Sequence, residues 1–179
     1  MTDYIAFFRG INVGGRNILA MKDLIKHLED MGCKNVSTYI QSGNVVFRIE
    51  DKKTINLAEE ISSKILKSHG FSPRILLLKK PEFENAIKNN PFKTNDGKVL
   101  HFFFLESHPK NPDIEKLNSL KSQTEQFQLI EGVFYLYAPD GIGHSKLAAK
   151  VEQCLKVPVT ARNWNTVSKL NSMINIHRR

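Results

Sequence analysis

The sequence predicts an α+β fold of two ferredoxin-like (split βαβ) halves in tandem, with mainly antiparallel sheets and helices on one face. Residues 1–90 show the element order β-α-β-β-α-β, and residues 91–179 repeat that order and add a C-terminal helix. The chain of 179 residues is 41% hydrophobic and 25% charged, as is typical of globular domains. At this length the chain can bury a proper core.

The first half begins with a dense apolar run, YIAFF (4–8), which predicts a buried strand. Residues 21–31 place apolar side chains at i, i+3, i+4, i+7 and i+10, the spacing of one helix face. The alternating segments 35–40 and 44–49 predict two strands, and the Ser-Gly between them predicts a tight hairpin. Next we expect a helix over 52–69 and a strand at RILLL (74–78). A short helix, PEFENAIKNN (81–90), follows, with proline near its N-terminus, where proline is tolerated.

The second half repeats this order without sequence identity to the first. The polar segment 90–98 contains Pro, Asn and Gly and is the best candidate for the boundary. The predicted elements are a strand at 99–105, a helix at 112–121, a hairpin of strands 127–130 and 133–138, a helix at 145–156, a strand at 157–161 and a last helix that carries Trp164.

The bulk composition points to a reducing cytosol. Net charge is +8, divided as 14 basic against 10 acidic residues in 1–90 and 12 against 8 in 91–179. This even excess suits either an acidic or phosphate-bearing partner or merely a basic surface. Cys33 and Cys154 fit no metal or CxxC spacing, so we expect free thiols. No secretory signal and no long apolar run occur, so we expect a cytoplasmic protein with no membrane partner.

The glycine-rich stretch FFRGINVGGRN (7–17) raises the question of function. In a split βαβ unit the first two strands are parallel, so the loop after strand one and the hairpin between strands two and three emerge at the same sheet edge. The loop 10–17 and the turn 41–44 should therefore be neighbours. By similar reasoning the connections 137–146 and 160–166 should share one end of the second sheet.

Such loops suit an anion. Glycine permits positive φ and close approach, so successive N–H groups can point into one concavity, and a helix start adds free N–H groups. Arginine grips an oxyanion with two parallel bonds. The candidate ligand-binding residues are Arg9, Gly10, Asn12, Gly14, Gly15, Arg16, Gln41, Ser42, Asn44, Ser145, Lys146, Arg162 and Asn163.

The competing interpretation is that these glycines only make tight turns. Neither GxGxxG nor GxxxxGK[ST] is matched. The histidines show no metal spacing, so we expect no metal and no cofactor. His144 is the one candidate acid or base, yet no catalytic set can be defined, and whether the protein is an enzyme stays open. Trp164 is expected to anchor the last helix rather than to stack on a ligand.

Four segments resemble the uncharacterised bacterial family known as domain of unknown function 1697. They are FFRGINVGGRN, TYIQSGNVVF, YLYAPDGIGHSKL and TARNWNTVSKL, in the family's order and spacing. The resemblance implies a cytoplasmic bacterial protein with two ferredoxin-like halves, and it supplies no activity. Because the shared segments are the glycine loops and their polar flanks, it favours ligand contact over simple turns.

Two functions therefore compete. The first is a site for a small phosphate- or carboxylate-bearing molecule at the glycine loops. The alternative is a module that binds single-stranded RNA, as some ferredoxin-like sheets do, although NVVFRI and FYLYA lack the expected aromatic motif.

Overall fold

A computed structural model of the protein describes residues 1–51 and 56–176. The chain forms two compact units, one of Met1–Asn85 with the C-terminal residues from Lys169 onward, and one of Ala86–Ser168. Each unit holds a four-stranded sheet in which every neighbouring pair of strands is antiparallel. The predicted α+β fold is thereby confirmed.

The first unit follows the split βαβ order. Its sheet runs β2-β3-β1-β4, so β1 lies between β3 and β4 and is parallel to β2. The elements are β1 (Thr2–Arg9), α1 (Met21–Asp30), β2 (Lys34–Tyr39), β3 (Asn44–Ile49), α2 (Leu57–His69), β4 (Arg74–Lys79) and α3 (Lys80–Lys88), whose last residues belong to the second unit. The predicted start of the second helix, residues 52–55, lies outside the described residues.

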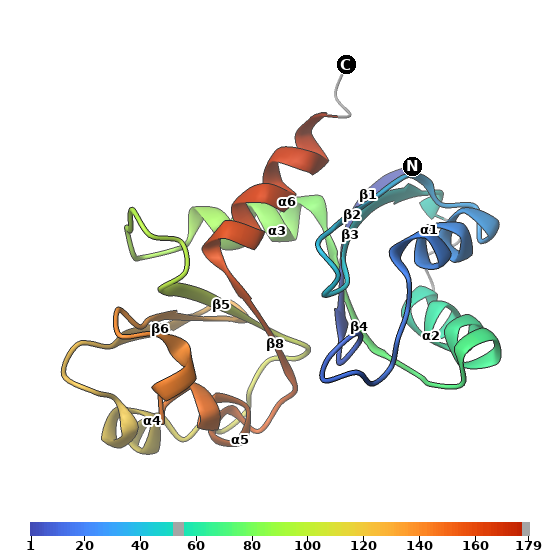
Figure 1. The fold of residues 1–179 in the computed structure, drawn as a ribbon. Coiled ribbons are helices and arrows are strands. Elements are labelled where there is room, and N and C mark those ends of the chain that lie inside the picture. Colours follow the sequence, from blue (N-terminus) through green and yellow to red (C-terminus); the bar gives the residue numbers. More distant parts are fainter. Residues whose placement is uncertain (52–55, 177–179) are drawn as a thin grey trace. The chain divides into compact units, whose positions relative to one another are not determined.

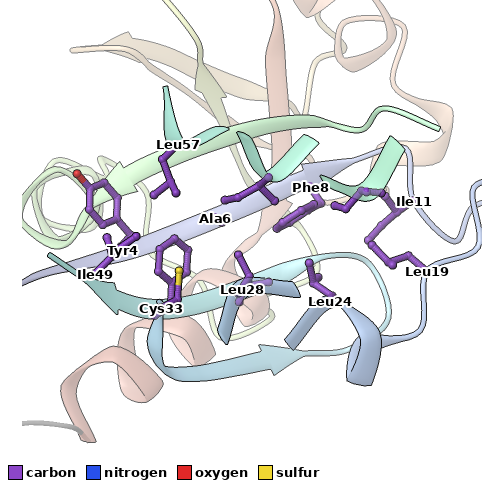
Figure 2. Close-up of a cluster of buried hydrophobic side chains, with 14 residues drawn as sticks. Tyr4, Ala6, Phe8, Ile11, Leu19, Leu24, Leu28, Cys33, Ile49 and Leu57 are labelled. Atoms are coloured by element: carbon purple, nitrogen blue, oxygen red, sulfur yellow. The ribbon is translucent and has the colours of Figure 1, made fainter. Parts of the chain in front are cut away.

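One face of this sheet packs against α1 and α2 (Figure 1). Alternate residues of β1 point to that face, because successive side chains of a strand project to opposite sides. Figure 2 shows Ala6 and Phe8 of β1 beside Leu24 and Leu28 of α1, all at most 1% exposed. The apolar spacing read from the sequence therefore matches the face that the helix buries.

The second unit repeats the topology. Its sheet runs β6-β7-β5-β8, and its core gathers between one sheet face and the short helices α4 and α5. The elements are β5 (Leu100–Leu105), α4 (Ile114–Leu120), β6 (Gln126–Ile130), β7 (Val133–Tyr137), η2 (Ile142–His144), η3 (Ala148–Lys150), α5 (Val151–Leu155), β8 (Val159–Asn163) and α6 (Trp164–Ile176), which ends in the first unit.

The predicted helix over 145–156 is wrong in its length. Within this range the structure has one 3₁₀ turn, η3, followed by the short helix α5. The Ser145 hydroxyl accepts the Ala148 N–H at 2.9 Å, and the Lys150 N–H donates to Leu147 O at 2.9 Å, an i to i+3 bond. These tighter bonds replace the α-helical pattern that apolar spacing suggested.

Trp164 packs as expected. Its ring stacks on Phe102 of β5, with centroids 5.6 Å apart and planes 27° apart. An offset aromatic pair of this kind stabilises the start of α6 on the sheet. No helix within the described residues is long and apolar enough to cross a membrane.

Candidate functional site

Residues 10–17 fold into a small hairpin directly after β1. The Arg16 N–H donates to Val13 O at 3.0 Å and closes it. Gly14 and Gly15 form the tip with φ of +57° and +73°, the pattern of a type I′ turn. A Cβ at either glycine would meet no heavy atom within 4 Å. Their N–H groups have no acceptor among the residues that the structure describes, so the tip presents open backbone donors.

The predicted meeting of the two loops is confirmed, and Asn12 holds them together. Its side-chain Nδ2 donates to Leu19 O at 2.9 Å and to Gln41 O at 2.8 Å. The Leu19 N–H in turn donates to Asn12 Oδ1 at 2.8 Å. This one carboxamide therefore joins the glycine loop, the approach to α1 and the β2–β3 turn.

Gly43 makes the close contact of the two loops possible. The Phe8 N–H donates to Gly43 O at 2.8 Å. Gly43 has φ of +73°, and a Cβ built there would lie 2.5 Å from Phe8 Cβ and 2.8 Å from Ile11 Cδ1. No side chain fits, so this glycine serves both conformation and packing. Sequence reasoning noticed the turn but did not single out Gly43.

The remaining predicted residues of the β2–β3 turn have different surroundings. Asn44 is fully buried, and its Nδ2 donates to Tyr39 O at 3.2 Å and to Ser42 Oγ at 2.9 Å. The Gln41 side chain is exposed. Asn44 and Ser42 therefore shape the turn, whereas Gln41 stands at its surface.

A pair of arginines marks the exit of β1. Arg9, the last residue of β1, stands directly opposite Arg74, the first residue of β4, and both are exposed. Arg16 is exposed on the adjoining hairpin. Strand alternation places Arg9 and Arg74 on the sheet face opposite α1 and α2. Sequence reasoning missed Arg74, because only the strand register brings it to Arg9.

The second glycine loop lines a cavity of about 520 Å³. This volume falls in the usual range of small-ligand sites. The lining residues come from the end of α4, the approach to β6 and the loop after β7; they are Ser119, Leu120, Ser122, Glu125, Asp140, Gly141, His144, Ser145 and Lys146. Two of the predicted ligand-binding residues, Ser145 and Lys146, thus line this cavity.

The residues that line this cavity carry charges of both signs. Glu125 is 5% exposed and accepts the Ser122 N–H at 2.9 Å, and Asp140 accepts from the Thr124 hydroxyl at 2.5 Å. These two carboxylates share the lining with Lys146, the one lysine among the lining residues. The cavity is therefore mixed in charge rather than purely cationic.

The other two predicted residues lie at the same end of the second sheet. Strand register places Tyr137 opposite Leu100 and Asn163 opposite His101, which confirms that both connections leave this end. Asn163 Oδ1 accepts the Thr166 N–H at 3.0 Å and so caps α6.

Arg162 lies on the other face of that sheet. It pairs with Phe102, whereas Phe103, the next residue of β5, packs with α4 and α5. Its Nη1 donates to Ala161 O at 2.8 Å, and burial lowers the pKa of Arg162 to about 10, which leaves it charged at neutral pH. The sequence analysis grouped Arg162 with Lys146, because chain order predicts that their loops share one end of the second sheet. It does not predict which face of the sheet each side chain occupies.

Thiols and metal-ligating groups give no further site. Cys33 and Cys154 are buried, 4% and 6% exposed, and neither is part of a disulfide. Within residues 1–51 and 56–176, no three His, Cys, Asp or Glu side chains gather closely enough to hold a metal ion.

Comparison with known proteins identifies the family. Residues 1–135 match the family described as "Protein of unknown function (DUF1697)". The chain belongs to this family. The family predicted from the motifs is confirmed. The match contains the segments FFRGINVGGRN and TYIQSGNVVF and ends within β7, so TARNWNTVSKL and nearly all of YLYAPDGIGHSKL follow it.

A solved structure extends the likeness of this DUF1697 chain to nearly its full length. It is described as that of "conserved bacterial protein SP0830 from Streptococcus pneumoniae". The two chains are 28% identical, with a TM-score of 0.67, over 97% of this chain and 98% of the other. No curated protein shows a significant match. Neither description names an activity, so the function has to be argued from the site.

Replacing Asn12 by alanine should lower the free energy of unfolding of this DUF1697 chain by about 2 kcal/mol, because three hydrogen bonds are lost, two of them partly buried. Urea unfolding followed by circular dichroism measures this loss. Asn35→Ala is the matched control, since Asn35 also has positive φ but is exposed. An equal loss in both variants would contradict a special role for Asn12.

Stability should also fall as pH drops. His101 is 7% exposed and its Nδ1 has no partner among the described residues. Burial lowers the pKa of His101, although a hydrogen bond to the Val99 backbone opposes the shift. Above about pH 6.5 the imidazole is neutral in both states, and below it the unfolded chain takes up the proton first.

Unfolding free energies at pH 8, 6.5 and 5 test this expectation. The stability of the wild type should decline below about pH 6.5, and His101→Gln should decline less. His108→Gln, at an exposed histidine, serves as the control and should follow the wild type. If His101→Gln and the wild type have parallel profiles, His101 does not contribute.

Proposed function

We propose that the first unit binds a small phosphate- or carboxylate-bearing ligand at the rim formed by residues 10–17 and the start of β4. The observation that carries this proposal is the placement of Arg9 directly opposite Arg74, beside the hairpin with open glycine N–H groups. The arginine pair and the glycine hairpin both suit a negatively charged ligand.

The arginine pair favours a bound anion on electrostatic grounds. Strand register brings the Arg9 and Arg74 guanidinium groups to one place on the sheet. A guanidinium can offer two parallel N–H donors to a phosphate or carboxylate. Arg16 adds a third guanidinium from the adjoining hairpin.

The hairpin supplies neutral donors. Gly14 and Gly15 have positive φ and carry no side chain of their own, so an oxyanion can come close to their N–H groups. We assign Asn12 and Asn44 to the shape of the rim, since their amide donors already bond within the loops. Gln41, which is exposed, is the amide left to orient a ligand.

The second glycine loop fits this ligand less well. Lys146 shares its cavity with Glu125 and Asp140, and two carboxylates would repel a simple anion. A ligand there would need to carry both charges or many hydroxyl groups. We therefore place the anion at the first loop.

Calorimetric titration with inorganic phosphate, nucleotides and sugar phosphates tests the proposal. Arg9→Gln and Arg74→Gln should each weaken binding about tenfold or more, as expected for a lost charge-assisted hydrogen bond. Arg48→Gln is the matched control, because Arg48 lies toward the far end of the same sheet and pairs with Asp3 at 2.7 Å. Equal affinity and equal stoichiometry of inorganic phosphate binding in the wild type and both rim variants would refute the site, as would no binding at millimolar concentration.

The alternative, a single-stranded RNA module, requires exposed aromatic rings on the central strands. Phe7 of β1, Phe102 of β5 and Tyr135 of β7 are all 0% exposed, so they offer no stacking platform as the protein is folded. A salt-dependent gel shift with single-stranded RNA would favour this alternative over the small-anion site.

A further inference from the structure

A second cavity lies in the helical layer of the second unit, apart from the loops considered above. Its volume is about 470 Å³, and it is lined by Asp113, Lys116, Lys150, Gln153, Cys154 and Lys156. The residues come from α4 with its preceding residue and from the segment that contains α5. The Asp113 N–H donates to Cys154 O at 2.8 Å and ties these two segments together.

The lining is strongly cationic. Three lysines face one aspartate, and the Asp113 carboxylate accepts the Lys116 backbone N–H at 2.9 Å as the cap of α4. The Lys150 ammonium donates to Gln153 Oε1 at 3.0 Å, which is a neutral partner. Neither Lys116 nor Lys156 forms an ion pair within the part of the chain that the structure describes. The lining therefore has an excess of positive charge, which the one aspartate offsets only in part.

Lys156 occupies an unusual backbone position. It follows α5 with φ of +59°, the left-handed conformation in which a helix usually ends on glycine. The left-handed conformation is unfavourable for lysine, yet Lys156 is one of the residues that line the cavity. Replacing Lys156 by glycine would therefore remove one positive charge from the cavity and also remove the conformational cost of a side chain at positive φ.

We propose that this cavity binds a compact, multiply charged phosphate of the diphosphate class. Lysine ammonium groups bind phosphate oxygens as point charges, and three of them match an anion with more than one negative charge. The volume suits a small ligand rather than a single ion. Gln153 is the neutral polar neighbour that would orient it, the Asp113 carboxylate is engaged as the cap of α4, and the buried Cys154 forms part of the apolar wall. This site is independent of the anion rim in the first unit.

Pyrophosphate is the probe, titrated into the full chain by calorimetry. Lys116→Gln and Lys156→Gly should each weaken binding about tenfold. Lys110→Gln removes the same charge at an exposed position outside the lining and should stay within about twofold of the wild type. Arg9→Gln and Arg74→Gln should also leave this binding event unchanged, which separates it from the rim of the first unit.

Thermal unfolding of each variant shows whether weaker binding results only from a loss of folded protein. Lys156→Gly should unfold at the same or a higher temperature than the wild type, because glycine adopts positive φ freely. Weaker binding together with undiminished stability supports the site. Equal weakening by Lys110→Gln would show general charge attraction, and full affinity in Lys116→Gln and Lys156→Gly or no saturable binding would overturn the proposal.

Discussion

Gly43→Ala should lower the free energy of unfolding by about 2–4 kcal/mol. The new methyl group would lie 2.5 Å from Phe8 Cβ and 2.8 Å from Ile11 Cδ1, and both neighbours are buried. Phe8 cannot yield easily, since its N–H is bonded to Gly43 O at 2.8 Å. The positive φ of Gly43 adds a backbone cost for any side chain.

Gly10→Ala is the control that isolates the packing contribution. Gly10 has nearly the same φ, +75°, but a Cβ there would meet nothing within 4 Å. Its substitution should cost only about 1 kcal/mol, from the backbone alone. Urea unfolding followed by circular dichroism compares the two variants. Equal losses at both positions would show that conformation, not close approach, governs Gly43.

The convergence of the glycine loop and the 41–44 turn could be predicted from sequence because it depends only on chain order. Once YIAFF and NVSTYI are taken as parallel strands of one split βαβ unit, the loops that follow them must emerge at one edge. The hydrogen bond from Asn12 to Gln41 O confirms that geometry. Apolar periodicity likewise located α1, since Leu24 and Leu28 fall on its buried face.

The features that the sequence could not reveal depend on register and on local competition. Arg74 meets Arg9 only because β4 pairs with β1 at that residue. Arg162 does not join Lys146 in one site, because strand alternation puts the Arg162 side chain on the sheet face opposite α4 and α5. The structural role of Asn12 could not be predicted either. An asparagine in a glycine-rich loop can donate its side-chain amide to a ligand or to a backbone carbonyl, and the sequence does not distinguish these two cases.

Phe134→Ala should lower the free energy of unfolding by about 3–5 kcal/mol, as large-to-small changes in packed cores do. Phe134 of β7 is 0% exposed and belongs to the second unit's hydrophobic core. Its ring lies edge-on to Phe103, with centroids 5.7 Å apart, and stacks on Phe127 at 5.0 Å. Alanine removes both aromatic pairs and leaves a cavity that the strand backbone cannot close.

Two variants separate the cavity from the ring contacts, and urea unfolding measures both. Phe134→Leu refills most of the volume and should cost only about 1–2 kcal/mol. Phe127→Ala deletes the stacked partner at a half-buried site and should also cost less than Phe134→Ala, because solvent can fill part of the space. A loss below about 1 kcal/mol in Phe134→Ala would mean that β5 and β7 close over the gap. The ring would then not organise this core.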